Sequence, residues 1–167
     1  MLFHYDDGGR SRYYKAKNVN DCVTRAVAIA TGKDYKEVYD DLNRLAKTER
    51  KGTKKRFISN SREGVAKRTS RKYLDSIGWS FKPLMSIGSG CKVHLSEEDL
   101  EANGLDYGTY ILKLSKHLTV IKDGVIYDTY DPSRDGERCI YGYYYKRASF
   151  DEASTRAERV KVRLEEA

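Results

Sequence analysis

The first half of the chain carries apolar residues at helical spacing. Residues 22–31 are apolar over most of their surface, follow Asp21 as a candidate N-cap and end at Gly32, a pattern that predicts a buried helix. Further helical patterns cover residues 35–48 and 63–77, with apolar residues recurring on one side. The N-terminal half is therefore expected to be helical.

The second half changes to the period of β-strands. Four β-rich segments are predicted as strands: residues 79–84, 108–122, 125–131 and 138–145. Asp123-Gly124 separates the middle two, and Asp-Gly between β-rich runs is a strong signal for a hairpin turn. Ser96 starts a short helix of capping-box type that ends near Gly104. Helices followed by an antiparallel sheet predict the α+β fold class.

The length of 167 residues predicts a single domain over residues 1–167. Residues 1–17 are expected to be a loose lead-in, and residues 151–167 a charged C-terminal helix. No apolar run approaches the roughly 18 residues that a membrane helix needs, and the first residues lack the charged start of a secretion signal. We therefore expect a cytoplasmic protein with no membrane partner.

Positive charge is concentrated in the middle of the chain. The formal net charge is +7, and eight basic residues gather between the two halves: Lys51, Lys54, Lys55, Arg56, Lys67, Arg68, Arg71 and Lys72. This cluster is either an ordinary solvated face or a surface that attracts an acidic substrate or partner. Nucleic acid is less favoured, because aromatic residues are sparse in the segment and no groove-reading motif is present.

Three cysteines stand far apart, at Cys22, Cys91 and Cys139. Their odd number and the lack of a Cys-x-x-Cys pair argue against a disulfide framework and a zinc site, so we expect no disulfide, no metal and no cofactor. Cys22 differs from the other two because it opens a predicted helix, where unpaired backbone N–H groups favour the thiolate. It is either a small buried apolar residue or a nucleophile. Which of the two is favoured depends on its context, the other residues that the chain offers as a base and an acid.

That context is a histidine and an acid further along the chain. Of the three histidines, only His117 lies within a predicted strand. If the hairpin turn has two residues, Thr119 pairs with Asp128, which puts Asp128 on the same face as His117. A bulge or a longer loop would shift the register and select Asp131 instead. Nucleophile, base and orienting acid would thus follow in the order Cys22, His117 and Asp128, with Asp131 as the alternative acid.

Two features resemble the papain-like cysteine peptidases in their minimal form. These are Asp-Cys opening an apolar helix at residues 21–22, and His-Leu-Thr-Val-Ile from His117 followed by Tyr-Asp-Thr-Tyr-Asp-Pro. Residues 21–32, 87–95 and 128–134 also resemble segments of a group of small uncharacterised phage and bacterial proteins. The resemblance implies a papain-like fold, with N-terminal helices packed on a C-terminal antiparallel sheet.

The chain departs from the papain-like pattern at the oxyanion site. The larger family has a glutamine shortly before the nucleophile, and here that position is Ala16. Asn20 or Asn18 would have to supply the side-chain donor, together with the backbone N–H of Cys22. Asp131-Pro132 resembles the Asp-Pro that ends the catalytic strand of some bacteriocin-leader peptidases, which keeps Asp131 open as the acid.

The resemblance implies a cysteine hydrolase, acting as a peptidase, isopeptidase or amidase through an acyl-enzyme. Two alternatives stay open: a transglutaminase-like acyltransferase with the same chemistry, and a non-catalytic basic module that binds polyanions or proteins. The expected partner is a protein or peptide substrate, with an acidic one suggested by the charge. If the chain is viral, the expected location is the host cytoplasm. Substrate identity and oligomeric state are left open, because fold does not fix function.

Overall fold

The computed structural model describes residues 1–16, 19–50 and 58–148 of the chain. Its helical elements are the 3-10 turn η1 (Arg10–Arg12) and the α-helices α1 (Cys22–Thr31), α2 (Tyr35–Ala46), α3 (Lys67–Ser76) and α4 (Glu97–Ala102). The predicted helix at residues 22–31 is confirmed with the same bounds.

The third helix is shorter than predicted. It begins at Lys67 rather than at residue 63, because Asn60 and Gly64 form an isolated β-bridge that closes a turn ahead of it. The predicted C-terminal helix at residues 151–167 and much of the basic loop, residues 51–57, lie outside the described residues.

The strands form one six-stranded mixed sheet in the order β1-β5-β4-β3-β6-β2. They are β1 (Phe3–Tyr5), β2 (Trp79–Pro83), β3 (Thr109–Leu114), β4 (His117–Lys122), β5 (Val125–Asp128) and β6 (Gly142–Lys146). All neighbouring pairs are antiparallel except β1 and β5, which run parallel. The α+β class is therefore confirmed, and the expectation of a purely antiparallel sheet is wrong at one edge.

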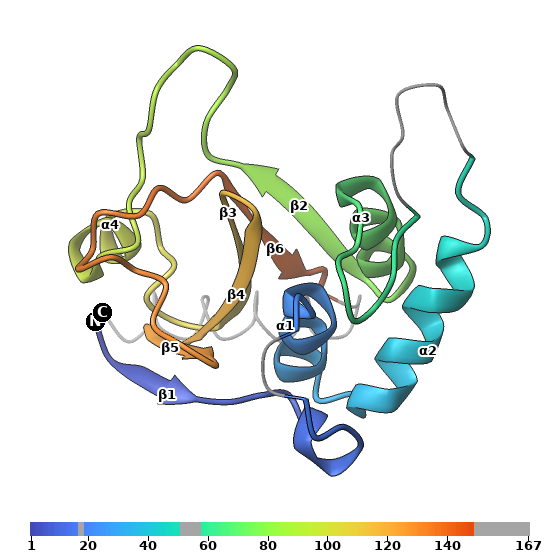
Figure 1. Ribbon diagram of the computed structural model, residues 1–167. Coiled ribbons are helices and arrows are strands. Elements are labelled where there is room, and N and C mark those ends of the chain that lie inside the picture. Colours follow the sequence, from blue (N-terminus) through green and yellow to red (C-terminus); the bar gives the residue numbers. More distant parts are fainter. Residues whose placement is uncertain (17–18, 51–57, 149–167) are drawn as a thin grey trace, which may run out of the picture.

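Helices cover both faces of this sheet (Figure 1). Along β3 and β4, Ile111 and Val120 belong to the apolar core shared with α1, α2 and α3. Their neighbours Leu112 and Ile121 belong to a second core shared with α4 and the segments around it. This alternation follows from the two-residue period of a strand, and it explains why both strands are apolar at nearly every position.

The N-terminal residues are more ordered than a loose lead-in. Phe3–Tyr5 pairs with β5, and Arg10 is buried. Arg10 contacts Asp21, which occupies the N-cap position of α1 but makes no side-chain capping bond there. The predicted capping role of Asp21 is therefore wrong, because its carboxylate is used by a buried ionic network.

The segment at residues 108–122 is two strands rather than one. It turns at Ser115 and Lys116, where Lys116 takes a φ of 54°, and no glycine, asparagine or proline marks this turn in the sequence. The next turn, at Asp123-Gly124, is the predicted two-residue turn, because Lys122 pairs with Val125. The predicted register of this hairpin is thus confirmed.

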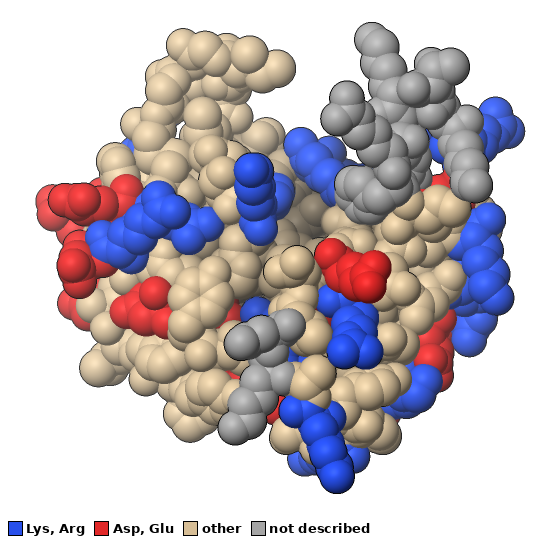
Figure 2. Space-filling view, in the orientation of Figure 1, with Lys and Arg blue, Asp and Glu red and all other residues tan. Residues whose placement is uncertain are grey.

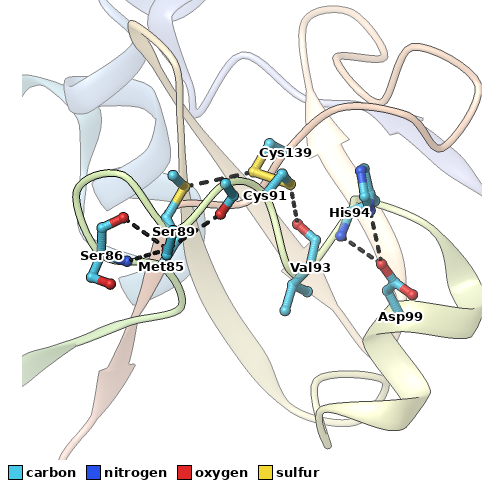
Figure 3. Close-up of a disulfide and its surroundings, with 9 residues drawn as sticks. Met85, Ser86, Ser89, Cys91, Val93, His94, Asp99 and Cys139 are labelled. Carbon is cyan, nitrogen blue, oxygen red and sulfur yellow. Dashed lines mark hydrogen bonds and ion pairs between the residues drawn. A yellow bond between two sulfur atoms is a disulfide. The ribbon is translucent and has the colours of Figure 1, made fainter.

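Cys91 and Cys139 form a disulfide, so the expectation of no disulfide is wrong (Figure 3). Their Cα atoms are 5.8 Å apart although 48 residues separate them in the sequence. An isolated bridge between His94 and Cys139 brings the two segments together, and the predicted strand at residues 138–145 becomes continuous only from Gly142. The sequence carried no local signal for this long-range contact.

No helix in the described part of the chain is long and apolar enough to cross a membrane. Disulfides are typical of oxidising compartments, and this one does not support the expected cytoplasmic location. That location stays a prediction.

Candidate active site

Cys22 is the first residue of α1, the buried helix that packs against β4. The first backbone N–H groups of a helix have no partner within the helix and favour a nearby negative charge. The backbone N–H of Leu118, on β4, also faces the Cys22 sulfur. Since Cys91 and Cys139 are bonded to each other, Cys22 is the free thiol of the protein.

His117 is the first residue of β4 and is buried. Its Nε2 lies 2.7 Å from Oδ2 of Asp128. The thiol of Cys22 also interacts with His117, and this interaction adds to that of Asp128 in raising the pKa of the imidazole. One imidazole therefore interacts with both an acid and a thiol.

Asp128 ends β5 and is buried. The register pairs Val120 with Tyr127, which places Asp128 on the face of His117 as the two-residue turn predicts. The second carboxylate oxygen of Asp128, Oδ1, accepts the backbone N–H of Thr129 at 2.7 Å. Asp131, the alternative acid, is exposed and accepts the backbone N–H of Ser133. The structure therefore places Asp128, and not Asp131, against the histidine.

The pKa shifts of these three groups all favour the charged form of each side chain. Burial alone would raise the pKa of Cys22, but hydrogen bonding and charge interaction with His117 outweigh it and lower that pKa. Burial would lower the pKa of His117, yet its bonds to Asp128 and Cys22 raise it. Burial would raise the pKa of Asp128, and the bond to His117 lowers it overall. Together these shifts favour a thiolate, an imidazolium and a carboxylate.

Arg25 is a site residue that the sequence analysis did not single out. Its Nη2 lies 3.3 Å from Oδ1 of Asp128, and its Nη1 contacts Asp21. Asp21 in turn accepts bonds from Arg10 and from the hydroxyl of Tyr35, at 3.1 and 2.7 Å. An arginine on an otherwise apolar helix was the available signal, because a buried cation needs partners. The network holds Asp128 from the side opposite His117.

Tyr130 is a second residue without an assigned role in the sequence analysis. Its ring centroid lies 5.2 Å from that of His117, with 38° between the ring planes. The residue is 48% exposed and lines the same cleft as His117.

Cys22 and His117 open into a cleft of about 740 Å³ between α1, the start of α3 and the sheet. Asn20, the candidate oxyanion donor, lines this cleft, whereas Asn18 lies outside the described residues. Lys and Arg side chains border a hollow on this face of the molecule (Figure 2). The cleft is large enough for a short peptide segment.

No group of three or more His, Cys, Asp or Glu residues in the described ranges is arranged to hold a metal ion. The arrangement of Cys22, His117 and Asp128 has instead the form of an activated nucleophile: a thiol, a base, and an acid that orients the base.

No protein-family model, curated protein or solved structure matches this chain. The geometry of the site is therefore the basis for a function.

Proposed function

We propose that this protein is a cysteine hydrolase with a papain-like fold, in which Cys22 is the nucleophile, His117 the general base and Asp128 the orienting acid. The observation that carries the proposal is the buried His117, which bonds Asp128 and interacts with the free thiol at the start of α1. Each of the three side chains comes from a different element, and all have the pKa shift that the chemistry needs.

In the proposed reaction, His117 holds the proton of Cys22 as an imidazolium, and the thiolate attacks the carbonyl carbon of the substrate. The negative charge moves to the carbonyl oxygen, where the backbone N–H of Cys22 and the side chain of Asn20 are the candidate donors. His117 then gives its proton to the leaving amine, and a thioester remains on Cys22. Water attacks this thioester, loses a proton to His117 and releases the acid.

Asp128 acts through the histidine. By accepting the N–H of Nε2 it leaves Nδ1 as the ring nitrogen that can exchange a proton with the thiol, and its charge stabilises the imidazolium. His117 and, to a smaller extent, Arg25 keep this buried carboxylate ionised, since Asp128 would otherwise be costly to bury as an anion.

The same acyl-enzyme serves an amine acceptor as well as water. Transglutaminase-like acyl transfer is therefore the second outcome of the same proposed mechanism, and product analysis with an added primary amine separates it from hydrolysis.

A second groove, on α3 and β2, favours a different function, the binding of a polyanion. This groove, of about 770 Å³, is lined by Lys67, Arg68, Arg71 and Lys72 of α3 and by the aromatic rings of Trp79 and Phe81 on β2. Arg71 lies over the ring of Phe81, 4.2 Å from its centroid. Basic and aromatic side chains together favour a polyanion. Binding of a labelled oligonucleotide that Arg68→Glu abolishes would support this function.

The test of the hydrolase proposal is alkylation of Cys22 by iodoacetamide under non-reducing conditions. With the disulfide intact, all labelling arises from Cys22, and it should be faster at pH 6 than for an ordinary thiol, whose pKa is about 8.5. His117→Gln should remove the excess reactivity, and His4→Gln is the matched control because His4 lies at the surface on β1. A Cys22 that reacts like an ordinary thiol in the folded wild-type protein would reject the proposal.

A further inference from the structure

The cleft around Cys22 contains lysines without ionic partners. Lys67, Lys113 and Lys116 all line it, and none takes part in an ion pair within the described residues. Arg25 also lines the cleft but is paired with two buried carboxylates. Among the described lining residues Glu63 is the single acid, and it is exposed. The cleft therefore presents more positive than negative charge to a bound molecule.

Lys113 is the most informative of the three, because it is partly buried whereas Lys67 and Lys116 are exposed. It lies on β3 directly opposite Leu118, the residue whose N–H faces the Cys22 sulfur. Burial lowers the pKa of Lys113, and the charge of Cys22 opposes this shift. Desolvating an ammonium group costs free energy, and a negative group bound beside it would offset part of that cost.

We propose that this cleft takes a substrate with a carboxylate close to the scissile carbonyl, and that Lys113 binds that carboxylate while Lys67 and Lys116 attract it. This inference deepens the proposed hydrolase function and depends on it. A singly charged carboxylate fits better than a doubly charged phosphate, because Glu63 lines the same cleft and repels the second negative charge more strongly. Acidic peptides are the substrates of a peptide hydrolase that carry such a group.

The experiment compares matched probes that alkylate Cys22. One pair is iodoacetate and iodoacetamide. Both form a bond between the sulfur and their methylene carbon and release iodide, and they differ in one negative charge. The other pair is two tripeptide vinyl sulfones that carry either Glu or Gln next to the electrophile. The second-order rate constant is measured for each probe, with mass spectrometry to place the product on Cys22, and each result is expressed as an anion-to-neutral ratio.

The wild-type protein should react about fivefold faster with the Glu probe than with the Gln probe, a ratio that corresponds to the free energy of one partly exposed ion pair. Salt should reduce this ratio. Lys113→Gln should bring the ratio near one, and Lys113→Glu should reverse it. Lys82→Glu is the matched control: it makes the same change in charge on an exposed part of β2 outside the cleft lining, and should leave the ratio unchanged.

The outcomes separate this inference from the hydrolase proposal. Equal rates for the Glu and Gln probes, with a Cys22 that still reacts faster than an ordinary thiol, would overturn the carboxylate site and leave the hydrolase intact. A Cys22 with no excess reactivity toward any probe would overturn both. A Lys113-dependent preference for iodoacetate alone would support the carboxylate site and assign it to a small acid rather than a peptide.

Discussion

Two regions of the molecule bring a cysteine, a histidine and an aspartate together, and they differ in nearly everything except residue type. In the first, His117 bonds Asp128 at 2.7 Å, and their side chains are 7% and 3% exposed. In the second, His94 lies 3.2 Å from Asp99, with side chains 43% and 30% exposed.

The cysteines of the two regions differ as well. Cys22 is a free thiol at the start of a buried helix, whereas Cys139, the bridge partner of His94, is held in the disulfide with Cys91 (Figure 3). A thiolate can form only in the first region. Proximity of a cysteine, a histidine and an aspartate is therefore not enough to make a candidate active site. Burial, a helix N-terminus and a reduced sulfur distinguish such a site from a structural cluster.

Replacing the cysteines should produce the largest difference between the two regions. Cys22→Ala should reduce hydrolysis of a p-nitrophenyl ester of an acidic peptide to background, a loss of about 10⁴-fold or more, because the acyl-enzyme cannot form. The measurement is the release of p-nitrophenol. The double variant Cys91→Ser/Cys139→Ser should stay active, and activity in Cys22→Ala protein would show that the nucleophile lies elsewhere.

Replacing the aspartates of the two regions, Asp128 and Asp99, should produce the next largest difference in activity. Asp128→Asn should lower the same activity by about 10²- to 10⁴-fold, because the amide no longer stabilises the imidazolium in its working tautomer. Asp99→Asn and Asp131→Asn should change the rate by less than about threefold, since neither contacts His117. Far-UV circular dichroism checks that each variant is folded. A loss confined to Asp131→Asn would mean that the acid assignment is wrong.

The pH dependence of alkylation should separate the two kinds of thiol by a smaller factor. The lowered pKa of Cys22 keeps it as a thiolate below the ordinary thiol pKa of about 8.5, and the raised pKa of His117 keeps the imidazolium above its ordinary value of about 6.5. At pH 6, Cys22 should react with iodoacetamide at least about tenfold faster than Cys91 and Cys139 do in reduced, unfolded protein.

Asp128→Asn should narrow the pH range in which the thiolate and the imidazolium coexist, at both its acidic and its alkaline end. Removing the carboxylate lowers the pKa of His117, so the imidazolium is lost at lower pH and supports the thiolate less. The pH–rate profile of the variant should therefore move toward that of a free thiol. An unchanged profile would show that Asp128 does not act through the histidine.

The disulfide should have the smallest effect on activity. Cys91→Ser/Cys139→Ser removes a link across 48 residues and should lower the free energy of unfolding by about 2–4 kcal/mol in a urea titration. Activity of the folded variant should change by less than about twofold, because the bond lies apart from the residues that line the Cys22 cleft. A large loss of activity without unfolding would show that the two regions are coupled.

The sequence by itself determined the features that depend on neighbouring residues. The bounds of α1 follow from its apolar run and from Gly32 behind it, and they place Cys22 at the helix start. The Asp-Gly turn fixes the register of β4 with β5, and the register places Asp128 on the face of His117. Both are consequences of fixed periods, 3.6 residues for a helix and two for a strand, so a short stretch of sequence suffices.

Only the tertiary structure decided the features that join distant segments. The disulfide, the parallel pairing of β1 with β5 and the ionic network of Arg10, Asp21 and Arg25 each depend on contacts that no local pattern encodes. Asp21 shows the reason most clearly: its position predicts a helix cap, but two buried arginines use its carboxylate instead. Burial makes an unpaired charge so costly that the partners available in the folded chain, rather than sequence position, decide what each charged side chain does.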